Sequence, residues 1–242
     1  MNPWVLATRS EVELAELRES LAPHAIDVLA YPTLCEQAHH APQQWATLRR
    51  RFDDARCIAF TSARAPSAVL REAEPYALAQ AIVGIPAAAV GKATATSAAA
   101  AGFRVVVVGD AGGERLAEML HPRLDPGAVA VHACGSDHRE DLASGLRRRG
   151  HEVLELPVYA MSPAHASELP PLPEVPPCAV LLSSPNAARA YLRHVRAGLL
   201  RVPHIAMGPA TAAALHGSAI PVVVLERPTA DAIVEELCQI CS

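Results

Sequence analysis

The sequence predicts an α/β protein made of two lobes, each a doubly wound parallel sheet. Short apolar segments alternate with helical segments along almost the whole chain, which is the pattern of parallel strands joined by crossover helices. A Pro-rich segment at 161–177 interrupts this alternation once. The motif Gly-x-Ala-Thr follows an expected strand in each half of the chain, at 91–94 and at 208–211. This repeat indicates that the two lobes are similar.

The chain opens with one strand–helix–strand unit. Residues 5–8, three apolar residues followed by Thr8, are expected to form the first strand. Ser10 and Glu13 have the spacing of a capping box, which marks the start of a helix. A second strand is expected over 24–31 and stops at Pro32, because proline cannot donate a backbone hydrogen bond.

The middle of the chain supplies five further strands after a polar, His-rich connector at 36–44. A helix at about 45–53 comes before the first of them, and helical stretches separate the others. The connector histidines lack the spacing of a helical metal-ligand pair, so we interpret them as solvated loop residues. The five strands are expected near 57–61, 86–90, 104–108, 128–133 and 152–159.

The alternation resumes after the Pro-rich segment. Three strands are expected near 178–183, 203–207 and 221–225, and the last helix at about 229–239 with Pro228 at its head. With the two strands at the beginning of the chain, these again make five. The predicted architecture is therefore two doubly wound (flavodoxin-like) lobes, one of them discontinuous. The predicted lobes are 1–32 plus 162–242 and 36–158, with linkers near 32–36 and 156–162.

Such sheets bind ligands outside the carboxyl ends of their strands, and two facing lobes are expected to enclose a cleft. In each Gly-x-Ala-Thr segment, a glycine turn leads into the first turn of a helix, whose free N–H groups attract anions. Thr94 and Thr211 add a hydroxyl there. A looser echo places Ser62 and Ser184 after two other strands. The alternative for each of these hydroxyl residues is a plain helix N-cap.

Composition excludes several classes of protein. The net charge is −4 and no long basic run occurs, so nucleic acid is not an expected partner. The beginning of the chain lacks the pattern of a signal peptide, and no apolar run reaches the roughly 18 residues of a membrane span, so a cytoplasmic location is expected. The six cysteines are scattered, and the Cys-x-x-Cys at 238–241 ends a helix, so neither a redox pair nor a metal site is predicted.

Few residues are candidates for catalysis. No nucleophile elbow, metal-ligand motif or pair of carboxylates stands out. The glycine-rich segment 109–114 does not match a phosphate-binding motif, and we interpret it as a turn and helix cap. Tyr159 lies at the inferred crossing between the lobes, where its hydroxyl could donate or accept a proton. The alternative is a strand tyrosine that packs against the linker. Arg139, near the start of a helix, is either an anion contact or a solvated residue.

Short motifs spread over nearly the whole chain resemble one known family, the uroporphyrinogen-III synthases. Each motif is weakly specific, but their order is the family's order. Two positions depart from the family pattern: Arg64 stands where Asn is usual, and Leu182-Ser183 stands where Phe-Thr is usual. The motifs lie at 5–9, 60–65, 89–94, 135–150, 158–159, 183–187, 206–211 and 228–229.

The resemblance implies an enzyme without a cofactor, a lyase of haem biosynthesis, whose lobes are joined by a two-stranded linker. Its substrate would be hydroxymethylbilane, a linear tetrapyrrole with many carboxylates. Water is lost, and the ring closes with inversion of the last pyrrole to give uroporphyrinogen III. The resemblance makes Tyr159 the catalytic candidate, as proton donor to the departing hydroxyl, and gives Thr94 a role in orienting the substrate. Further binding candidates are Thr8, Arg9, Ser62, Lys92, Ser184, Thr211 and Thr229.

Two other functions remain open at this point. One is a two-lobed module that binds a small anion without catalysis, since such proteins share the split plan. The other is a weakly active family member that is retained as a partner in tetrapyrrole metabolism, for which Arg64 is the one hint. No partner other than the substrate is expected, and a monomer is predicted.

Overall fold

The chain consists of two compact α/β units. The structure is a computed structural model that describes residues 2–110, 112–195, 197–226 and 229–241. Unit 1 comprises residues 1–35 and 162–242, and unit 2 comprises residues 36–161. The sequence therefore passes from one unit to the other twice. Among the described residues, no helix is both long enough and apolar enough to cross a membrane.

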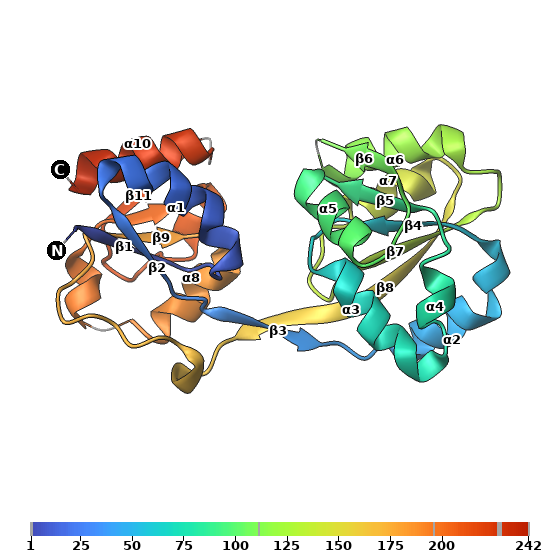
Figure 1. Ribbon diagram of the computed structural model, residues 1–242, viewed down its shortest axis with the longest axis horizontal. Coiled ribbons are helices and arrows are strands. Elements are labelled where there is room, and N and C mark those ends of the chain that lie inside the picture. Colours follow the sequence, from blue (N-terminus) through green and yellow to red (C-terminus); the bar gives the residue numbers. More distant parts are fainter. Residues whose placement is uncertain (1, 111, 196, 227–228, 242) are drawn as a thin grey trace. The chain divides into compact units, whose positions relative to one another are not determined.

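Unit 1 has a five-stranded sheet in which segments from both ends of the chain are neighbours (Figure 1). All of its strand pairs are parallel, and Val5 of the first strand is in register with Ala179 of the ninth. The strand order is β11-β10-β9-β1-β2. The bounds are β1 (Trp4–Ala7), β2 (Asp27–Ala30), β9 (Ala179–Leu182), β10 (His204–Ala206) and β11 (Val222–Val224).

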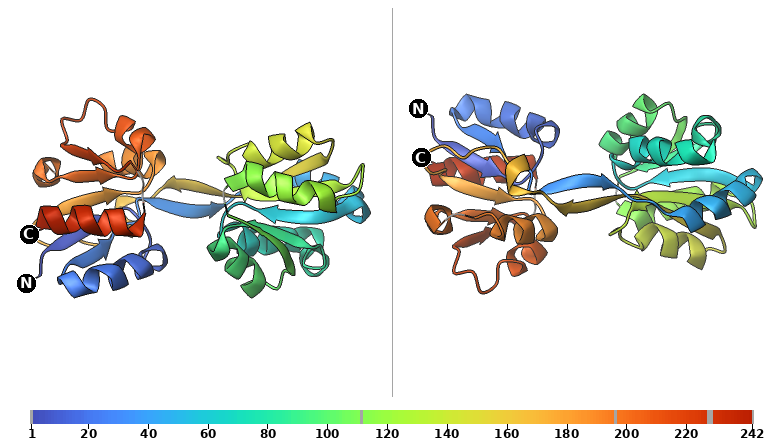
Figure 2. Two further views of the ribbon diagram at one scale, coloured as in Figure 1. Left: turned by 90° about the horizontal axis from the view of Figure 1, so that it is seen from above. Right: turned by 90° about the horizontal axis from the view of Figure 1, so that it is seen from below.

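Helices cover both faces of this sheet (Figure 2). Successive side chains of β1 point to opposite faces of the sheet, and both faces are apolar. Val5 and Ala7 belong to one apolar cluster, and Trp4 and Leu6 belong to another. The first cluster includes side chains of α1 (Ala15–Leu21) and α10 (Ala230–Cys241). The second includes side chains of α8 (Pro185–Leu192), and α9 (Pro209–Ala213) contacts α8.

Unit 2 has a six-stranded sheet in the order β3-β8-β7-β4-β5-β6. Strands β4 to β8 pair in parallel, in agreement with the predicted doubly wound fold. The bounds are β3 (Leu34–Ala38), β4 (Ala55–Phe60), β5 (Ala87–Val90), β6 (Val105–Gly109), β7 (Val129–Gly135) and β8 (Glu152–Pro163).

The two faces of this second sheet carry different helices. One apolar cluster joins it to α2 (Pro42–Arg50), α3 (Ala65–Ala73), α4 (Ala79–Ile82) and α5 (Lys92–Ala100). The other joins it to α6 (Gly112–Leu120) and α7 (Asp141–Arg148). Short 3₁₀ helices complete the described chain at Val12–Leu14, Ala22–His24, Phe52–Asp54, Glu74–Tyr76, His121–Arg123, Ala166–Glu168 and Ala197–Arg201.

The strand β3 differs from the sequence prediction, which placed a connector from residue 36 onward. Glu36, Gln37 and Ala38 are exposed and yet belong to a strand at the edge of the sheet. An edge strand with exposed side chains has no apolar alternation, so the sequence pattern does not reveal it. The chain crosses between the units within this strand, after Cys35, and within β8, after Met161.

The predicted capping box at Ser10 is only half formed. The Glu13 carboxylate accepts from the backbone N–H of Ser10 at 3.0 Å, as the motif requires. The Ser10 hydroxyl, however, donates to the same carboxylate at 2.8 Å. The first turn is a 3₁₀ helix in which the Glu13 N–H already bonds the Ser10 carbonyl, so the side chain has no free N–H to accept from.

Two glycines allow α6 and α7 to approach each other closely. A methyl group on Gly113 would lie 2.7 Å from the backbone nitrogen of Leu142. A methyl group on Gly145 would lie 2.8 Å from the Cβ atom of Ala117. Both separations are shorter than van der Waals contact, so neither position accepts a side chain without movement of a helix.

His204 is a buried titratable group of unit 1. Its Nδ1 donates to the Val202 carbonyl at 2.8 Å, and its Nε2 lies 3.0 Å from the Tyr191 hydroxyl. Because a carbonyl only accepts, Nε2 is the acceptor of the Tyr191 proton in the neutral ring. Burial lowers the pKa of His204, and the hydrogen bond to Val202 offsets part of this effect.

We therefore expect His204 to make the folded protein less stable in mild acid. Below the ordinary histidine pKa of about 6.5 the unfolded chain binds a proton that the folded chain resists. The free energy of unfolding therefore decreases as the pH is lowered. Urea unfolding between about pH 7.5 and pH 5 should show a flatter dependence in His204→Gln than in the unaltered protein. Equal slopes in the two proteins would contradict this assignment.

Candidate active site

A cavity of about 350 Å³ lies at the carboxyl edge of the unit 2 sheet. Residues at or just after the carboxyl ends of β4, β5 and β7 line it, β8 contributes Tyr159 from within the strand, and the first turns of α6 and α7 contribute the glycines, Asp141 and Leu142. This is the edge at which doubly wound sheets bind ligands. The lining residues are Thr61, Ser62, Val90, Gly112, Gly113, Gly135, Asp137, His138, Arg139, Asp141, Leu142 and Tyr159.

Tyr159 is held against β7 in this cavity. Its side chain is only 8% exposed, and its backbone carbonyl accepts from the Ser136 N–H at 2.8 Å. The ring lies on Gly135, where a Cβ atom would be 3.0 Å from the Cζ atom and 3.1 Å from the phenol oxygen. The bare backbone at Gly135 is thus what allows the phenol to sit at this position.

The surroundings raise the pKa of the Tyr159 phenol overall. Burial is the largest cause, and the charges of Cys134 and Glu36 add to it, while a hydrogen bond with Ser62 and the positive charge of Arg64 act against the increase. The Ser62 hydroxyl also accepts from the backbone N–H of Arg64 at 3.3 Å. The phenol therefore keeps its proton at neutral pH and has two neighbours that favour the phenolate once the proton leaves.

The position of Gly135 leads to a first test of this arrangement. Gly135→Ala is expected to lower turnover by about tenfold or more, because the new methyl group displaces the ring and misplaces a reacting group. The rate should be compared with that of Gly198→Ala, where no atom lies within 4 Å of the added methyl. Equal rates in the two variants would show that the ring position is unimportant.

Other predicted residues of unit 2 lie outside this cavity lining. Gly91 turns the chain with φ at 77°, as its motif requires, and α5 begins at Lys92. The Lys92 side chain is exposed, whereas Thr94 is buried in the first helical turn. The structure thus brings Ser62 and Tyr159 together, and it does not place Lys92 or Thr94 among the residues that line the cavity.

In unit 1, Thr8 joins the ends of two neighbouring strands. Its hydroxyl donates to the Leu181 carbonyl at 3.2 Å and accepts from the Ser183 N–H at 3.0 Å. Ser183 returns a bond from its own hydroxyl to the Thr8 carbonyl at 3.1 Å. Arg9 follows at the same edge, with its guanidinium 3.7 Å from the Met207 sulfur. Ser183 was identified from the sequence only as a departure from the family pattern and not as a site residue, and the bond partner that the structure gives it is 175 residues away.

Two predicted binding residues of unit 1 act as helix N-caps. The Ser184 hydroxyl accepts from the Ala187 N–H at 3.2 Å, and the Thr229 hydroxyl accepts from the Ala232 N–H at 3.3 Å. This agrees with the capping alternative given for such residues. Pro228 lies outside the described residues.

Thr211 lies in the short helix α9 and is only 3% exposed. Gly208 has a positive φ of 126°, which parallels Gly91 in the other unit. The helix contains five residues and begins with Pro209, which has no N–H to offer. The anion site expected at this turn therefore has fewer donors than its counterpart at α5.

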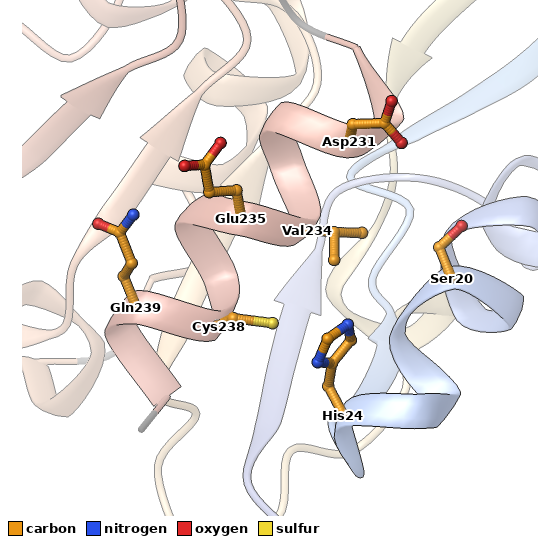
Figure 3. A pocket seen from close by; sticks show the side chains of 7 residues that line it. All are labelled: Ser20, His24, Asp231, Val234, Glu235, Cys238 and Gln239. Carbon is orange, nitrogen blue, oxygen red and sulfur yellow. The ribbon is translucent and has the colours of Figure 1, made fainter.

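A larger hollow of about 520 Å³ in unit 1 contains none of the predicted site residues (Figure 3). It lies between α10 and the segment that includes α1, and Figure 3 shows the carboxylates of Asp231 and Glu235 along α10. No arginine or lysine is among its described lining residues to offset these two carboxylates, which disfavours an anionic ligand. The cavity around Tyr159 also has two carboxylates, Asp137 and Asp141, but Arg139 lines it as well. The cavity around Tyr159 is the better candidate for chemistry.

The cavity lining also includes His138, a residue that sequence reasoning missed, and its ring contacts a carboxylate outside the lining. The Nδ1 atom of His138 lies 3.0 Å from the Gly135 carbonyl, and its Nε2 atom lies 2.6 Å from a Glu155 oxygen. Arg147 pairs with the other oxygen of Glu155. Burial and these partners act in opposite directions on Glu155, and the pKa of its carboxyl is lowered overall. The residues come from β8, α7 and the loop after β7, so no sequence spacing connects them.

Arg139, which was an alternative anion contact, is paired within its own turn. Its guanidinium lies 2.6 Å from the Asp141 carboxylate, and its side chain is 88% exposed. It lines the cavity from the solvent side. An exposed pair of this kind contributes little to stability, so the guanidinium is available to exchange partners.

Comparisons with known proteins agree on one family. A family model described as uroporphyrinogen-III synthase HemD matches residues 15–235. No curated protein matches the sequence. The structure is similar to that of uroporphyrinogen-III synthetase from Helicobacter pylori 26695, with a TM-score of 0.66 and 18% identity, covering 99% of this chain and 100% of that one.

A second similar structure is a mutant uroporphyrinogen III synthase from the extremely thermophilic bacterium Thermus thermophilus. Its TM-score is 0.54 and its identity 16%, and the match covers 98% of each chain. At these identities the two structures bear on the fold, and both support the two α/β units described above.

Proposed function

The chain belongs to the uroporphyrinogen-III synthase family, and on this basis we propose that it is a lyase that closes hydroxymethylbilane to uroporphyrinogen III. Water leaves the hydroxymethyl end of the linear tetrapyrrole, and the last pyrrole ring is inverted as the macrocycle forms. The observation that carries the proposal for this site is the protonated phenol of Tyr159 in the cavity of unit 2. Family membership does not support the alternative of a binding module without catalysis.

Tyr159 serves as the proton donor in this proposal. The bond between carbon and the hydroxyl oxygen breaks, the oxygen takes the phenol proton, and water departs. The phenolate left behind is stabilised by the Ser62 hydroxyl and by the charge of Arg64, both of which favour the deprotonated form. A proton from the reaction or from solvent later restores the phenol. In this proposal Arg64, at a position where the family usually has Asn, stabilises the phenolate of Tyr159.

Two helix N-termini at the cavity support the binding of the carboxylates of such a substrate. The first turn of α6 presents Gly112 and Gly113 to the cavity, and the first turn of α7 presents Asp141 and Leu142. Helix N-termini attract anions through their free N–H groups and the helix dipole. A protein with a net charge of −4 can therefore hold a polycarboxylate, because the attraction is local.

We propose further that the protein works as a monomer in the cytoplasm and needs no cofactor. All six cysteines are free thiols, which suits a reducing compartment. Burial raises the pKa of Cys241 to about 12, and a hydrogen bond with Cys178 adds to the increase, so this thiol of the Cys-x-x-Cys motif stays protonated. Light scattering at micromolar concentration checks the oligomeric state.

A product-isomer assay tests the main proposal. Hydroxymethylbilane is generated in situ and incubated with and without the protein, and the products are oxidised and separated by chromatography. We expect isomer III to dominate when the protein is present, because the uncatalysed closure gives the symmetric isomer I. Isomer I alone, formed at the uncatalysed rate, would reject the enzymatic function for this chain.

A further inference from the structure

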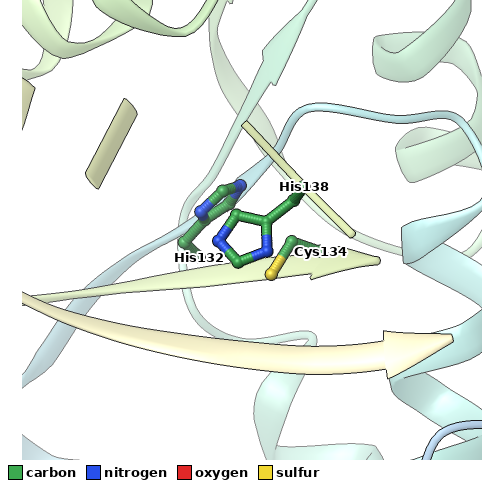
Figure 4. A group of neighbouring side chains, drawn as sticks. All are labelled: His132, Cys134 and His138. Atoms are coloured by element: carbon green, nitrogen blue, oxygen red, sulfur yellow. The ribbon is translucent and has the colours of Figure 1, made fainter. Parts of the chain in front are cut away.

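Three metal-ligating side chains of unit 2 meet beneath the candidate active site (Figure 4). His132 and Cys134 are two residues apart in β7, so both point to the same face of the sheet. His138 belongs to the loop that follows. One potential ligand atom of each residue lies within 4.8 Å of those of the other two. Figure 4 shows the two imidazole rings next to each other and the Cys134 sulfur beside His138.

His132 has a buried nitrogen atom without a partner. The residue is 1% exposed, and no described group hydrogen-bonds its Nδ1 atom. Its Nε2 atom lies 3.1 Å from the Thr61 hydroxyl. Burial lowers the pKa of His132 to about 4, so the ring is neutral. With the proton on Nε2 and donated to Thr61, the unpartnered Nδ1 atom carries a free lone pair.

His138 already has the supporting contacts of a metal-bound histidine. Its Nδ1 atom faces the Gly135 carbonyl, and its Nε2 atom faces the Glu155 carboxylate. Metal-ligating histidines almost always donate their second ring N–H to a carbonyl or carboxylate oxygen. A metal ion on either nitrogen of His138 takes the place of that nitrogen's present contact, and the other nitrogen keeps its acceptor.

Cys134 supplies the third donor. Its sulfur lies in a buried position, and burial raises its pKa to about 12, with the charge of Glu155 adding to this increase. A divalent metal ion displaces the thiol proton, which is released to solvent, and forms a bond to the thiolate with no change of oxidation state.

We propose that His132, Cys134 and His138 form a binding site for a divalent transition metal ion of the zinc class. Two imidazole nitrogens and one thiolate make a donor set that suits zinc and disfavours magnesium and calcium, which prefer oxygen. The ion reaches the site through the cavity that His138 lines, and a water molecule completes a four-coordinate shell. The spacing His-x-Cys-x₃-His is not a familiar zinc motif, which is why the sequence analysis predicted no metal.

The thiolate among the three donors allows the site to be tested by absorption spectroscopy. Cobalt(II) is the probe, since it occupies zinc sites and a cobalt–thiolate bond produces a charge-transfer absorption. Titration of the metal-free, full-length protein is expected to give this absorption with saturation at one equivalent, and zinc should abolish it by displacement. Absence of the absorption in the unaltered protein would overturn the proposal.

Two substitutions locate the thiolate. Cys134→Ser should remove the charge-transfer absorption, while Cys57→Ser should retain it in full. Cys57 is a matched control because it is also buried, lies on the neighbouring strand β4, and belongs to an apolar cluster on the same sheet. Retention of the absorption in Cys134→Ser, or its loss in Cys57→Ser, would place the site elsewhere.

Two further variants keep the test decisive if a core substitution impairs folding. His138 lies on a loop with a side chain that is 16% exposed, so His138→Gln is expected to fold. It should lower the cobalt affinity strongly, and an unchanged affinity would contradict the proposal. Thr61→Val removes the contact that orients His132, and should weaken binding by about 10- to 100-fold, whereas Thr61→Ser should bind as the unaltered protein does.

Discussion

Tyr159→Phe is expected to lower kcat by about 10²- to 10⁴-fold, the range for loss of a general acid. The phenol proton is what the departing hydroxyl needs, and Phe retains the ring that rests on Gly135. The folded protein should lose only about 1 kcal/mol of stability, the typical contribution of one hydrogen bond, here the one to Ser62. Rate and stability should therefore respond very differently to the same substitution.

Tyr191→Phe supplies the matched control. This tyrosine is fully buried in unit 1 and its hydroxyl bonds His204, but it lies outside the candidate active site. Its loss should reduce the free energy of unfolding by a similar amount and leave the rate of isomer III formation unchanged. Steady-state kinetics and urea unfolding of both variants make the comparison. A Tyr159→Phe enzyme with the unaltered rate would remove this residue from the catalytic step.

Gly113→Ala is expected to destabilise unit 2 by about 1–3 kcal/mol, the usual cost of overpacking. Its methyl group would meet the backbone nitrogen of Leu142 at 2.7 Å, and a backbone atom cannot move aside as a flexible side chain does. The helices α6 and α7 must therefore separate. Because Gly113 also lines the cavity, substrate turnover should fall with stability.

Gly198→Ala is the control for this second prediction. Gly198 lies in a 3₁₀ helix, has no positive φ, and has no atom within 4 Å of the position that a methyl group would take. Alanine there should leave stability unchanged or raise it by up to about 1 kcal/mol through the unfolded state. Thermal and urea unfolding of the two variants measure the difference. If Gly113→Ala unfolds at the same denaturant concentration as Gly198→Ala, the close contact between α6 and α7 does not prevent a side chain at position 113.

The fold was largely predictable because most of its strands are buried on both faces. Strands such as β1, β4 and β7 are nearly continuous apolar runs, so their identity does not depend on knowing their neighbours. The edge strand β3 has exposed side chains and no such run, and its place beside β8 depends on a pairing with a distant segment. Sequence patterns therefore predict which segments are buried better than they predict which distant segments pair.

The candidate site was predictable only in part, for a related reason. The sequence placed Ser62 after one strand and Tyr159 at the expected end of another, and the structure has both in the lining of one cavity, with Tyr159 inside the longer strand β8. The hydroxyls of Thr8, Ser184 and Thr229 make bonds within their own turns or to an adjacent strand, which no pattern distinguishes from ligand binding. The cluster of His132, Cys134 and His138 depends on a loop conformation, and its contact with Glu155 depends on strand register.

The pairing of β1 with β9 also sets an order for events on the ribosome. Val5, Leu6 and Ala7 are completely buried in the finished protein, and β2 pairs with one side of them, but their partners on β9 begin only at Ala179. At typical synthesis rates the first strand waits roughly 9–35 s for that segment, while all 126 residues of the inserted unit are made in between. Unit 2 can thus complete its core before the unit that began first. During that interval the side of the first strand that will pair with β9 has no partner.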